Sequence, residues 1–310
     1  MFSQSFWINF YSVKMRILVT GSSGRVGYQI ANYFYKNRNE VVNIFMRNKT
    51  DLPNQIMLDI TEKEGVDRLF NRYKPDIVIH SAALTNVELC ETSKEFAYIY
   101  NVRATENIVS ACEKNRSRII FLSTSFVYSG KKRIYNEEDQ KDPINYYGVT
   151  KAQAEEVITR SDLDFLILRT DQPYDWIRNW QQDSNVTRVL KKLEANLEYE
   201  EIIDWYNNPT FIPDLVRAIS KLIEIGGKGI YHAVGKEYIS RYEWALKIAD
   251  VFNKDKTLIK PIESSKLKMK SKRPNANLSN KKIEKDTGIT FATINQGLEI
   301  MKTSGNIFLG

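Results

Sequence analysis

The 310-residue sequence contains only two cysteines, Cys90 and Cys112, and two histidines. Two cysteines are too few for a disulfide framework, and their spacing is not that of metal ligands, so we expect no metal site. No apolar run reaches the roughly 18 residues that a membrane-spanning helix requires. Residues 2–11 are aromatic but lack the basic start and the cleavage site of a signal peptide. We therefore expect a cytoplasmic, globular chain in which residues 1–14 are an extension before the first strand.

The charge is also modest, with a formal net value of +7. Much of the basic excess lies in residues 254–273, a Lys/Ser-rich stretch without the interleaved aromatic residues of a nucleic-acid-binding arm. We interpret this stretch as a solvated loop beside the pocket of an anionic small molecule. Neither a nucleic acid nor a membrane is predicted as a partner.

Three glycines follow the first apolar run, in Met15-Arg-Ile-Leu-Val-Thr-Gly-Ser-Ser-Gly-Arg-Val-Gly27. In such a turn Gly21 permits the tight bend, Gly24 lets backbone amides approach a pyrophosphate, and Gly27 lets the next helix pack closely on the strand. Helical apolar spacing continues after Gly27, and a helix N-terminus favours an anion. The sequence therefore predicts a dinucleotide-binding turn here.

Strand-like and helical segments alternate along the first half of the chain, which is typical of a doubly wound parallel sheet. We predict an α/β fold of Rossmann type at 15–170 and a smaller C-terminal substrate lobe at 171–310, with about 210–235 packing back on the first domain. The predicted strands are 16–20, 41–46, 77–80, 119–123, 165–169 and 229–234, and the predicted helices 26–37, 62–73, 94–114, 147–160, 213–225 and 240–252.

The end of the second predicted strand indicates which cofactor binds. NAD-specific sites usually place a carboxylate there for the ribose 2′-hydroxyl. This chain has Arg47 and Lys49 and no acid, and a guanidinium fits a 2′-phosphate well. We therefore predict a preference for NADP(H), with NAD(H) as the alternative if these two cations are only solvated surface charges.

A tyrosine and a lysine four residues apart, Tyr147 and Lys151, begin a predicted helix and share one of its faces. The ordinary pKa of tyrosine, about 10, is too high for acid-base work at neutral pH, and a nearby cation lowers it. Thr124 ends a buried strand and offers a hydroxyl to a substrate carbonyl. We predict Thr124, Tyr147 and Lys151 as the catalytic group, in which Lys151 also binds the cofactor ribose. Tyr146 lies five residues before Lys151 and does not have the required spacing.

These motifs together resemble the extended short-chain dehydrogenase/reductase family, and within it the dTDP-4-dehydrorhamnose reductases. Further blocks at 75–87, 135–139, 209–215 and 273–278 match that group in order. The resemblance implies NADPH-dependent reduction of a 4-keto-6-deoxy sugar nucleotide, and it leaves a homodimer open. The predicted cofactor contacts are Gly21, Ser23, Gly24, Arg25, Val26, Gly27, Arg47, Lys49, Asp59, Ile60, Ala82, Ala83, Asn101, Tyr147 and Lys151. The predicted substrate contacts are Thr85, Ser125, Phe126, Trp205 and Arg273.

Two departures from this group concern the sugar. The usual Thr-Asp-Tyr-Val-Phe-Asp-Gly is Thr124-Ser-Phe-Val-Tyr-Ser-Gly130 here, which keeps the hydroxyl but loses an acid and a phenol. The usual aromatic-Tyr-Gly segment after Thr170 is replaced by Asp171-Gln-Pro-Tyr-Asp-Trp176. The identity of the sugar therefore stays open.

Other functions remain in consideration. A nucleotide-sugar 4-epimerase would retain NAD, against which the second strand argues, and a dehydratase is disfavoured because Ser125 and Phe126 supply no acid. A non-catalytic subunit resembling the β subunit of methionine adenosyltransferase would keep the same nucleotide fold. We also expect Trp176, Trp180 and Trp205 to cluster in the substrate lobe, with Trp205 stacking on the nucleotide base.

Overall fold

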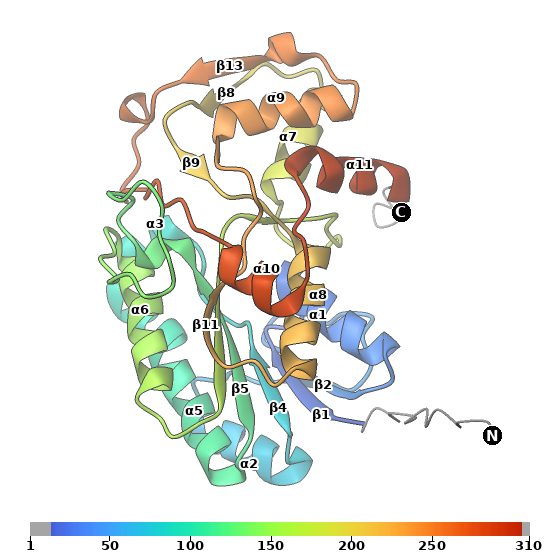
Figure 1. The fold of residues 1–310 in the computed structure, drawn as a ribbon, viewed down its shortest axis with the longest axis vertical. Coiled ribbons are helices and arrows are strands. Elements are labelled where there is room, and N and C mark those ends of the chain that lie inside the picture. The colour runs from blue at the N-terminus through green and yellow to red at the C-terminus, as the bar shows by residue number, and fades with distance from the viewer. Residues whose placement is uncertain (1–13, 306–310) are drawn as a thin grey trace, which may run out of the picture.

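The computed structural model describes residues 14–305 and shows a central sheet with helices on both faces, below a smaller lobe (Figure 1). Within these residues, seven strands pair in parallel in the order β11-β6-β5-β4-β1-β2-β3. The order β3-β2-β1-β4-β5-β6 is that of a Rossmann fold, extended here by one strand. The predicted fold class is thus confirmed. The strands are β1 (Arg16–Thr20), β2 (Glu40–Phe45), β3 (Gln55–Met57), β4 (Ile77–His80), β5 (Arg118–Thr124), β6 (Phe165–Thr170) and β11 (Gly229–His232).

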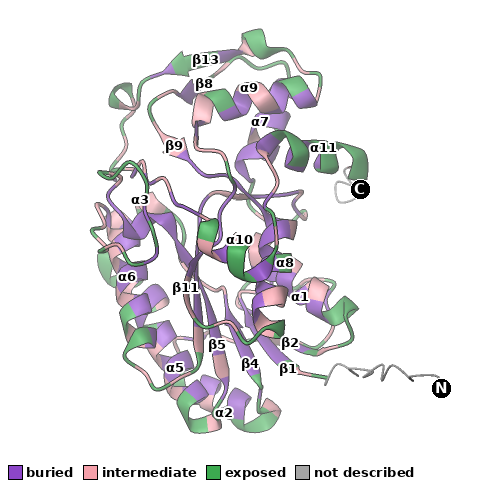
Figure 2. Cartoon of the chain, in the orientation of Figure 1, coloured by how far each residue is buried: buried purple, intermediate pink, exposed green. Residues whose placement is uncertain are grey.

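Helices cover both faces of the sheet, which explains why its strands read as nearly continuous apolar runs. One apolar core lies between the sheet and α1 (Arg25–Lys36) and α8 (Ile212–Glu224). The other lies between the sheet and α2 (Lys63–Tyr73), α5 (Ala104–Asn115) and α6 (Tyr146–Thr159). Figure 2 shows the result, with buried strands inside and the exposed residues on the outer faces of the helices.

The smaller lobe lies beyond the carboxyl ends of the strands, at the top of Figure 1. Its core gathers around the buried Trp244. Short strand pairs, β10 with β7, β12 with β9 and β13 with β8, tie its segments together. Its elements are β7 (Pro173–Tyr174), α7 (Asn185–Glu194), β8 (Tyr199–Ile202), β9 (Tyr206–Asn207), β10 (Thr210–Phe211), β12 (Ile239–Ser240), α9 (Arg241–Val251), β13 (Ile259–Ile262) and α11 (Ile294–Ser304).

The chain crosses between the two parts more than once. After β10 it returns to the sheet, where α8 packs beside α1 and β11 pairs in parallel with β6. Helix α10 (Lys281–Thr287) then packs on α8 and β11. The cavity described below therefore lies where the strand ends meet segments of the smaller lobe.

The segment 94–114, predicted as one helix, is instead three consecutive elements. They are α4 (Lys94–Tyr98), a π-helical turn at Ile99–Arg103, and α5. The π-turn contains Asn101, whose carboxamide accepts from Leu84 N at 2.7 Å and donates to Leu84 O at 3.1 Å. A contact with a distant loop therefore accompanies the irregular turn, and helical periodicity alone does not reveal it. A further short helix, α3 (Val87–Thr92), precedes α4.

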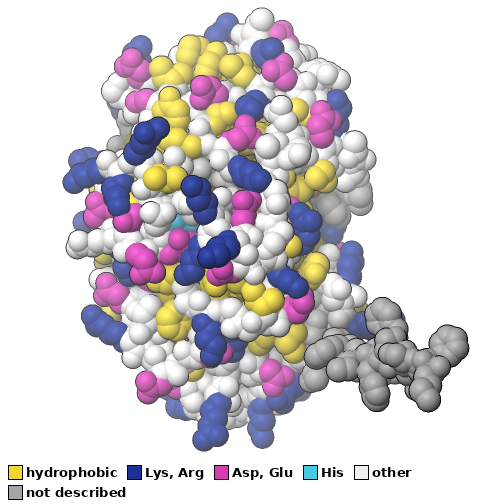
Figure 3. Space-filling view, in the orientation of Figure 1, with side chains coloured by type: hydrophobic (Ala, Val, Ile, Leu, Met, Phe, Trp, Pro, Cys, Tyr) yellow, Lys and Arg dark blue, Asp and Glu magenta, His cyan; other side chains and the backbone are white. Residues whose placement is uncertain are grey.

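In residues 14–305, no helix is both long and apolar enough to cross a membrane. Lys and Arg side chains are interspersed with Asp and Glu on the face that Figure 3 shows. Residues 1–13, most of the predicted extension, lie outside the described residues.

Candidate active site

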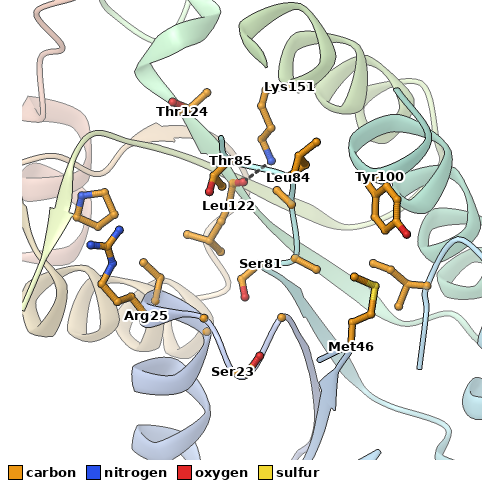
Figure 4. Close-up of a pocket in the computed structure, with 18 of the residues that line it drawn as sticks. Ser23, Arg25, Met46, Ser81, Leu84, Thr85, Tyr100, Leu122, Thr124 and Lys151 are labelled. Atoms are coloured by element: carbon orange, nitrogen blue, oxygen red, sulfur yellow. Dashed lines mark hydrogen bonds between the residues drawn. The ribbon is translucent and has the colours of Figure 1, made fainter. Parts of the chain in front are cut away.

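A cavity of about 560 Å³ runs along the carboxyl ends of the strands, within the range typical of cofactor and ligand pockets. Figure 4 shows its two ends: Ser23 and Met46 lie near the glycine turn, and Thr124 and Lys151 lie at the other end. We call these the nucleotide end and the catalytic end. Of the predicted site residues, the cavity is lined by Gly21, Ser23, Gly24, Arg25, Val26, Gly27, Arg47, Asp59, Ile60, Ala82, Ala83, Thr85, Thr124, Phe126, Tyr147 and Lys151.

The glycine turn can be made only with glycine at two positions. Gly21 has φ +67°, and a Cβ there would lie 2.8 Å from the backbone of Ala82. A Cβ on Gly27 would lie 2.3 Å from the carbonyl oxygen of Gly21, so this glycine sets the close packing of α1 on the turn. A Cβ on Gly24 would meet only Gly21 O, at 3.2 Å. These approaches form a cradle of backbone groups at the helix N-terminus that suits a pyrophosphate.

At the nucleotide end, Arg47 and Asn48 line the cavity just beyond β2. Arg47 is exposed, as a side chain that receives a phosphate from solvent should be. Lys49, the second predicted cation, is exposed and does not line the cavity. Asp59, also in the lining, accepts a hydrogen bond from Tyr100 OH at 3.3 Å.

At the catalytic end, two elements present Thr124, Tyr147 and Lys151 to the same space. Thr124 is the last residue of β5, and Tyr147 and Lys151 lie one turn apart on α6. The helix approaches the turn after β5 very closely, because a Cβ on Gly148 would lie 2.1 Å from the carbonyl oxygen of Phe126. The Phe126 ring packs edge-on against Tyr147 with centroids 5.6 Å apart, which excludes water from that side of the phenol.

The electrostatics of this end differ from our expectation that Lys151 lowers the pKa of Tyr147. Burial raises the pKa of the phenol, and a hydrogen bond with Thr124 offsets only part of that effect. The Lys151 ammonium instead donates to Leu122 O at 2.7 Å, the dashed line in Figure 4. Burial lowers the pKa of Lys151 to about 7, although Glu155 opposes this. In the structure, desolvation and not the charge of Lys151 therefore dominates the pKa of Tyr147.

A buried ion pair between Glu155 and Arg169 lies next to the catalytic end. Glu155, one turn after Lys151, receives two hydrogen bonds from Arg169 of β6, at 3.0 and 2.7 Å. Glu155 also accepts a hydrogen bond at 2.6 Å from the Oγ of Ser123, the residue immediately before Thr124. Burial opposes ionisation of Glu155, but the Arg169 and Ser123 contacts keep its pKa below the ordinary value. The pair therefore fixes α6 relative to both strands that end at the cavity.

Both histidines are structural, as expected from their strand positions. His80 bonds Thr20 at 2.7 Å and Thr105 at 3.1 Å, and His232 bonds Tyr128 at 3.0 Å. Burial lowers the pKa of each histidine to about 3, so both stay neutral. Among residues 14–305, no three His, Cys, Asp or Glu side chains gather as metal ligands.

Five predicted residues lie outside the cavity wall, namely Lys49, Asn101, Ser125, Trp205 and Arg273. The Asn101 carboxamide faces Leu84 and Thr150 instead, and the Arg273 guanidinium forms an ion pair with Glu88 at 2.7 Å. Ser125 lies behind the wall, next to Asp171.

The three tryptophans do not cluster as expected. Trp176 belongs to the core of the smaller lobe, and Trp180 donates to Ser23 O at the glycine turn. The guanidinium groups of Arg241 and Arg273 lie over the Trp205 ring, 4.8 and 5.6 Å from its centre. These two neighbours belong to segments that are distant from Trp205 in the sequence.

A polar group at the end of β6 also belongs to the site and was not predicted. Thr170, Asp171 and Gln172 all line the cavity. Burial raises the pKa of Asp171 to about 6. The available signal in the sequence is the departure of this segment from the reductase pattern. Ser81, Leu84 and Tyr100 were also missed.

Comparison with known proteins connects this geometry to a family. Residues 15–305 match the family model described as RmlD substrate binding domain. The chain belongs to this family. The spore coat polysaccharide biosynthesis protein SpsK of Bacillus subtilis is 31% identical to this chain over 238 residues, which are 76% of this chain and 78% of that protein. The methionine adenosyltransferase 2 subunit beta of Rattus norvegicus is 26% identical over 275 residues, covering 87% and 81% of the two chains.

Solved structures agree with the RmlD assignment. A dTDP-4-dehydrorhamnose reductase of Clostridium acetobutylicum superposes with a TM-score of 0.83, at 27% identity, over 94% of this chain and 99% of that chain. The corresponding enzyme of Bacillus anthracis in complex with NADP has a TM-score of 0.85 over 94% and 100%, and at 23% identity it supports the fold. The resemblance drawn from the sequence motifs is thus confirmed.

Proposed function

We propose that this RmlD-family chain reduces the 4-keto group of a 6-deoxy sugar nucleotide with NADPH. The observation that carries the proposal is the single cavity wall that joins the glycine turn to Thr124, Tyr147 and Lys151. It places a dinucleotide-binding turn and a proton donor at opposite ends of the same space, which is what hydride transfer to a carbonyl requires. The similarity to dTDP-4-dehydrorhamnose reductases supports this choice of substrate class.

In this proposal the residues of the catalytic end have distinct roles. Bound NADPH would supply a hydride to the carbonyl carbon. Tyr147 OH donates the proton to the carbonyl oxygen, and the Thr124 hydroxyl donates a hydrogen bond to that oxygen. Lys151 holds the cofactor ribose and stabilises the phenolate left after proton transfer. Phe126 and Thr85 border the space for the sugar.

The cofactor preference follows from the nucleotide end. Arg47 is a charge-matched partner for a 2′-phosphate, and the backbone cradle of the glycine turn fits a pyrophosphate. The NADP complex of the Bacillus anthracis enzyme supports the same preference. We propose NADP(H) as the main cofactor and NAD(H) as a weaker one. We also keep the division into a Rossmann domain at 15–170 and a substrate lobe at 171–310 as a proposal.

The proposed proton donor is tested by Tyr147→Phe, with Tyr146→Phe as the matched control on the neighbouring phenol. NADPH oxidation is followed by absorbance with a panel of 4-keto-6-deoxy sugar nucleotides, dTDP-4-dehydrorhamnose first. We expect Tyr147→Phe to lower kcat by roughly 10²-fold or more while NADPH binding, followed by fluorescence, is retained. The control should keep the parental kcat. Near-parental turnover by Tyr147→Phe would show that another group is the acid.

One alternative is favoured by a specific observation, the match over 87% of this chain to a methionine adenosyltransferase subunit beta. A non-catalytic subunit would bind the dinucleotide and a protein partner without reducing any sugar nucleotide. Affinity purification from cells, together with the substrate panel, separates the two functions. A stoichiometric hetero-complex combined with no turnover of any panel member would favour the regulatory function.

A further inference from the structure

Position 125 lacks the acid that follows the corresponding threonine in the reductase pattern. In the folded chain a carboxylate nevertheless lies beside it, because Ser125 Oγ donates to Asp171 Oδ1 at 2.9 Å. The two residues directly follow neighbouring parallel strands, whose register pairs Thr124 with Thr170. The end of β6 therefore places a carboxylate next to the position where the end of β5 has lost one.

We propose that Asp171 is a specificity-determining residue that replaces the missing acid and accepts a hydrogen bond from a hydroxyl of the sugar. The inference rests on the proposed reductase function, because it places a sugar nucleotide at the catalytic end of the cavity. The carboxylate that is missing after β5 is thus still present at the site. It is supplied by the residue that follows β6.

The surroundings of Asp171 leave room for a ligand. The residue lines the cavity, although only 3% of its surface is exposed. An ionised carboxylate has about four acceptor positions. The structure provides two hydrogen-bond donors to this carboxylate, Ser125 Oγ to Oδ1 and Asn208 N to Oδ2 at 2.8 Å, and the nearby Asn207 side chain also favours its ionised form. At least one acceptor position is thus left for a further donor.

The charge of Asp171 is also difficult to explain by packing alone. Both donors and the Asn207 side chain are neutral, and the guanidinium of Arg241, whose charge acts on Asp171, donates instead to Gln172 Oε1 at 2.8 Å. A buried carboxylate without an ion pair is costly, and a neutral side chain would join the strand ends at lower cost. Strongly perturbed carboxyl groups in a cleft are typical of functional sites.

A second, independent observation comes from Thr170. Thr170 lines the cavity, and its buried Oγ1 has no hydrogen-bond partner among residues 14–305. Buried hydroxyls without a partner are uncommon in folded proteins. Thr170 and Asp171 together offer a donor and an acceptor at adjacent positions. A sugar hydroxyl, which both donates and accepts, matches this pair.

The experiment moves the acid back to the position used in the reductase pattern. Asp171→Ser, Ser125→Asp and the double variant that exchanges the two residues are compared, with Asp171→Asn as an isosteric variant that keeps the packing. The measurements are KM for dTDP-4-dehydrorhamnose, calorimetric Kd for dTDP-rhamnose, fluorescence Kd for NADPH, and Tm. Ser125→Ala serves as the control that removes only the bridging hydroxyl.

We expect Asp171→Asn and Asp171→Ser to raise KM and the dTDP-rhamnose Kd by about tenfold or more, the loss of one hydrogen bond to a charged group. NADPH binding should be retained, and the exchange variant should recover most of the lost affinity. Unchanged sugar-nucleotide binding in a folded Asp171→Asn protein would overturn the inference. So would an exchange variant that folds and binds NADPH but recovers nothing.

The calorimetric measurement also separates this inference from the proposed function. Parental turnover combined with an unchanged KM in Asp171→Asn would contradict only the role of Asp171. If the parental protein neither reduces nor binds any sugar nucleotide of the panel, the reductase function fails, and the inference fails with it. A lower Tm of Asp171→Asn, with equal losses of affinity for NADPH and for the sugar nucleotide, would show that Asp171 has only a structural role and would overturn the inference.

Discussion

Lys151 allows the electrostatics of the catalytic end to be tested without any substrate. Its side chain is only 2% exposed and its ammonium donates to Leu122 O, with the Phe121 ring 3.8 Å away. Burial lowers its pKa to about 7 in the folded chain, whereas the pKa in the unfolded chain is about 10.4. Folding therefore releases a proton from this lysine throughout the pH range between these two values.

The sign of the effect on stability follows from proton linkage. Between pH 7 and 10.4 the unfolded chain binds more protons at Lys151 than the folded chain does, so the free energy of unfolding rises with pH. Below pH 7 both states are protonated and the full penalty of the buried charge is present. From pH 7 to pH 9.5, the folded chain should regain about 2–3 kcal/mol at this residue, close to 1.4 kcal/mol per pH unit at the steepest point.

The perturbation is Lys151→Met, which keeps much of the side-chain volume and removes the titration. Free energies of unfolding are measured by urea denaturation of the cofactor-free protein at half-unit steps between pH 7 and 9.5. We expect the advantage of Lys151→Met over the parent to shrink steadily as the pH rises. Lys63→Met is the control, because Lys63 is exposed and pairs with Asp67 at 2.7 Å. A parent-to-variant difference that stays constant across this range would refute the low pKa of Lys151.

Two further variants test the ends of the cavity. Arg47→Ala should weaken NADPH binding by about 10- to 100-fold through the loss of a charged phosphate contact, and it should change NADH binding little. Lys49→Ala should have a smaller effect on NADPH binding, because Lys49 does not line the cavity. Equal affinities of the parental protein for NADPH and NADH would contradict the predicted role of Arg47. Trp205→Ala should lower the free energy of unfolding by about 2–4 kcal/mol without a matching rise in KM, because two guanidinium groups lie over the Trp205 ring and the residue does not line the cavity. A large rise in KM at unchanged Tm would instead place Trp205 at the nucleotide base.

The central sheet could be predicted because its information is local. Each strand of the sheet is a short apolar run bounded by turn residues, and the helices between them carry their own periodicity. The glycine turn was also readable, since Gly21 must adopt a positive φ and Gly27 must admit the backbone of its neighbour. Where the signal was weak, as in the three-residue strand β3 or the two-residue pairs of the smaller lobe, the strands were missed. These depend on partners distant in the sequence.

The catalytic end could be predicted only in part for the same reason. The spacing of Tyr147 and Lys151 reveals their common face, but not that burial dominates their titration. The relation between Ser125 and Asp171 depends on the register of β5 and β6, so the loss of an acid at one strand end and its gain at the next looked like two unrelated departures. Arg273 illustrates the opposite case. Its motif matched, yet its guanidinium is paired with Glu88 and the residue does not line the cavity.

The protonation states of the site bear on the choice among its candidate reactions. A reductase needs a phenol that carries its proton when the carbonyl arrives, whereas an epimerase must first remove a proton from a sugar hydroxyl. Burial raises the pKa of Tyr147, so this phenol carries its proton at neutral pH. The pKa of Lys151 is lowered to about 7, so near neutral pH this group is partly charged and can stabilise the phenolate that forms after proton transfer. The protonated phenol is the form from which ketone reduction begins, whereas an epimerase must first deprotonate it, so the protonation state of Tyr147 agrees with ketone reduction.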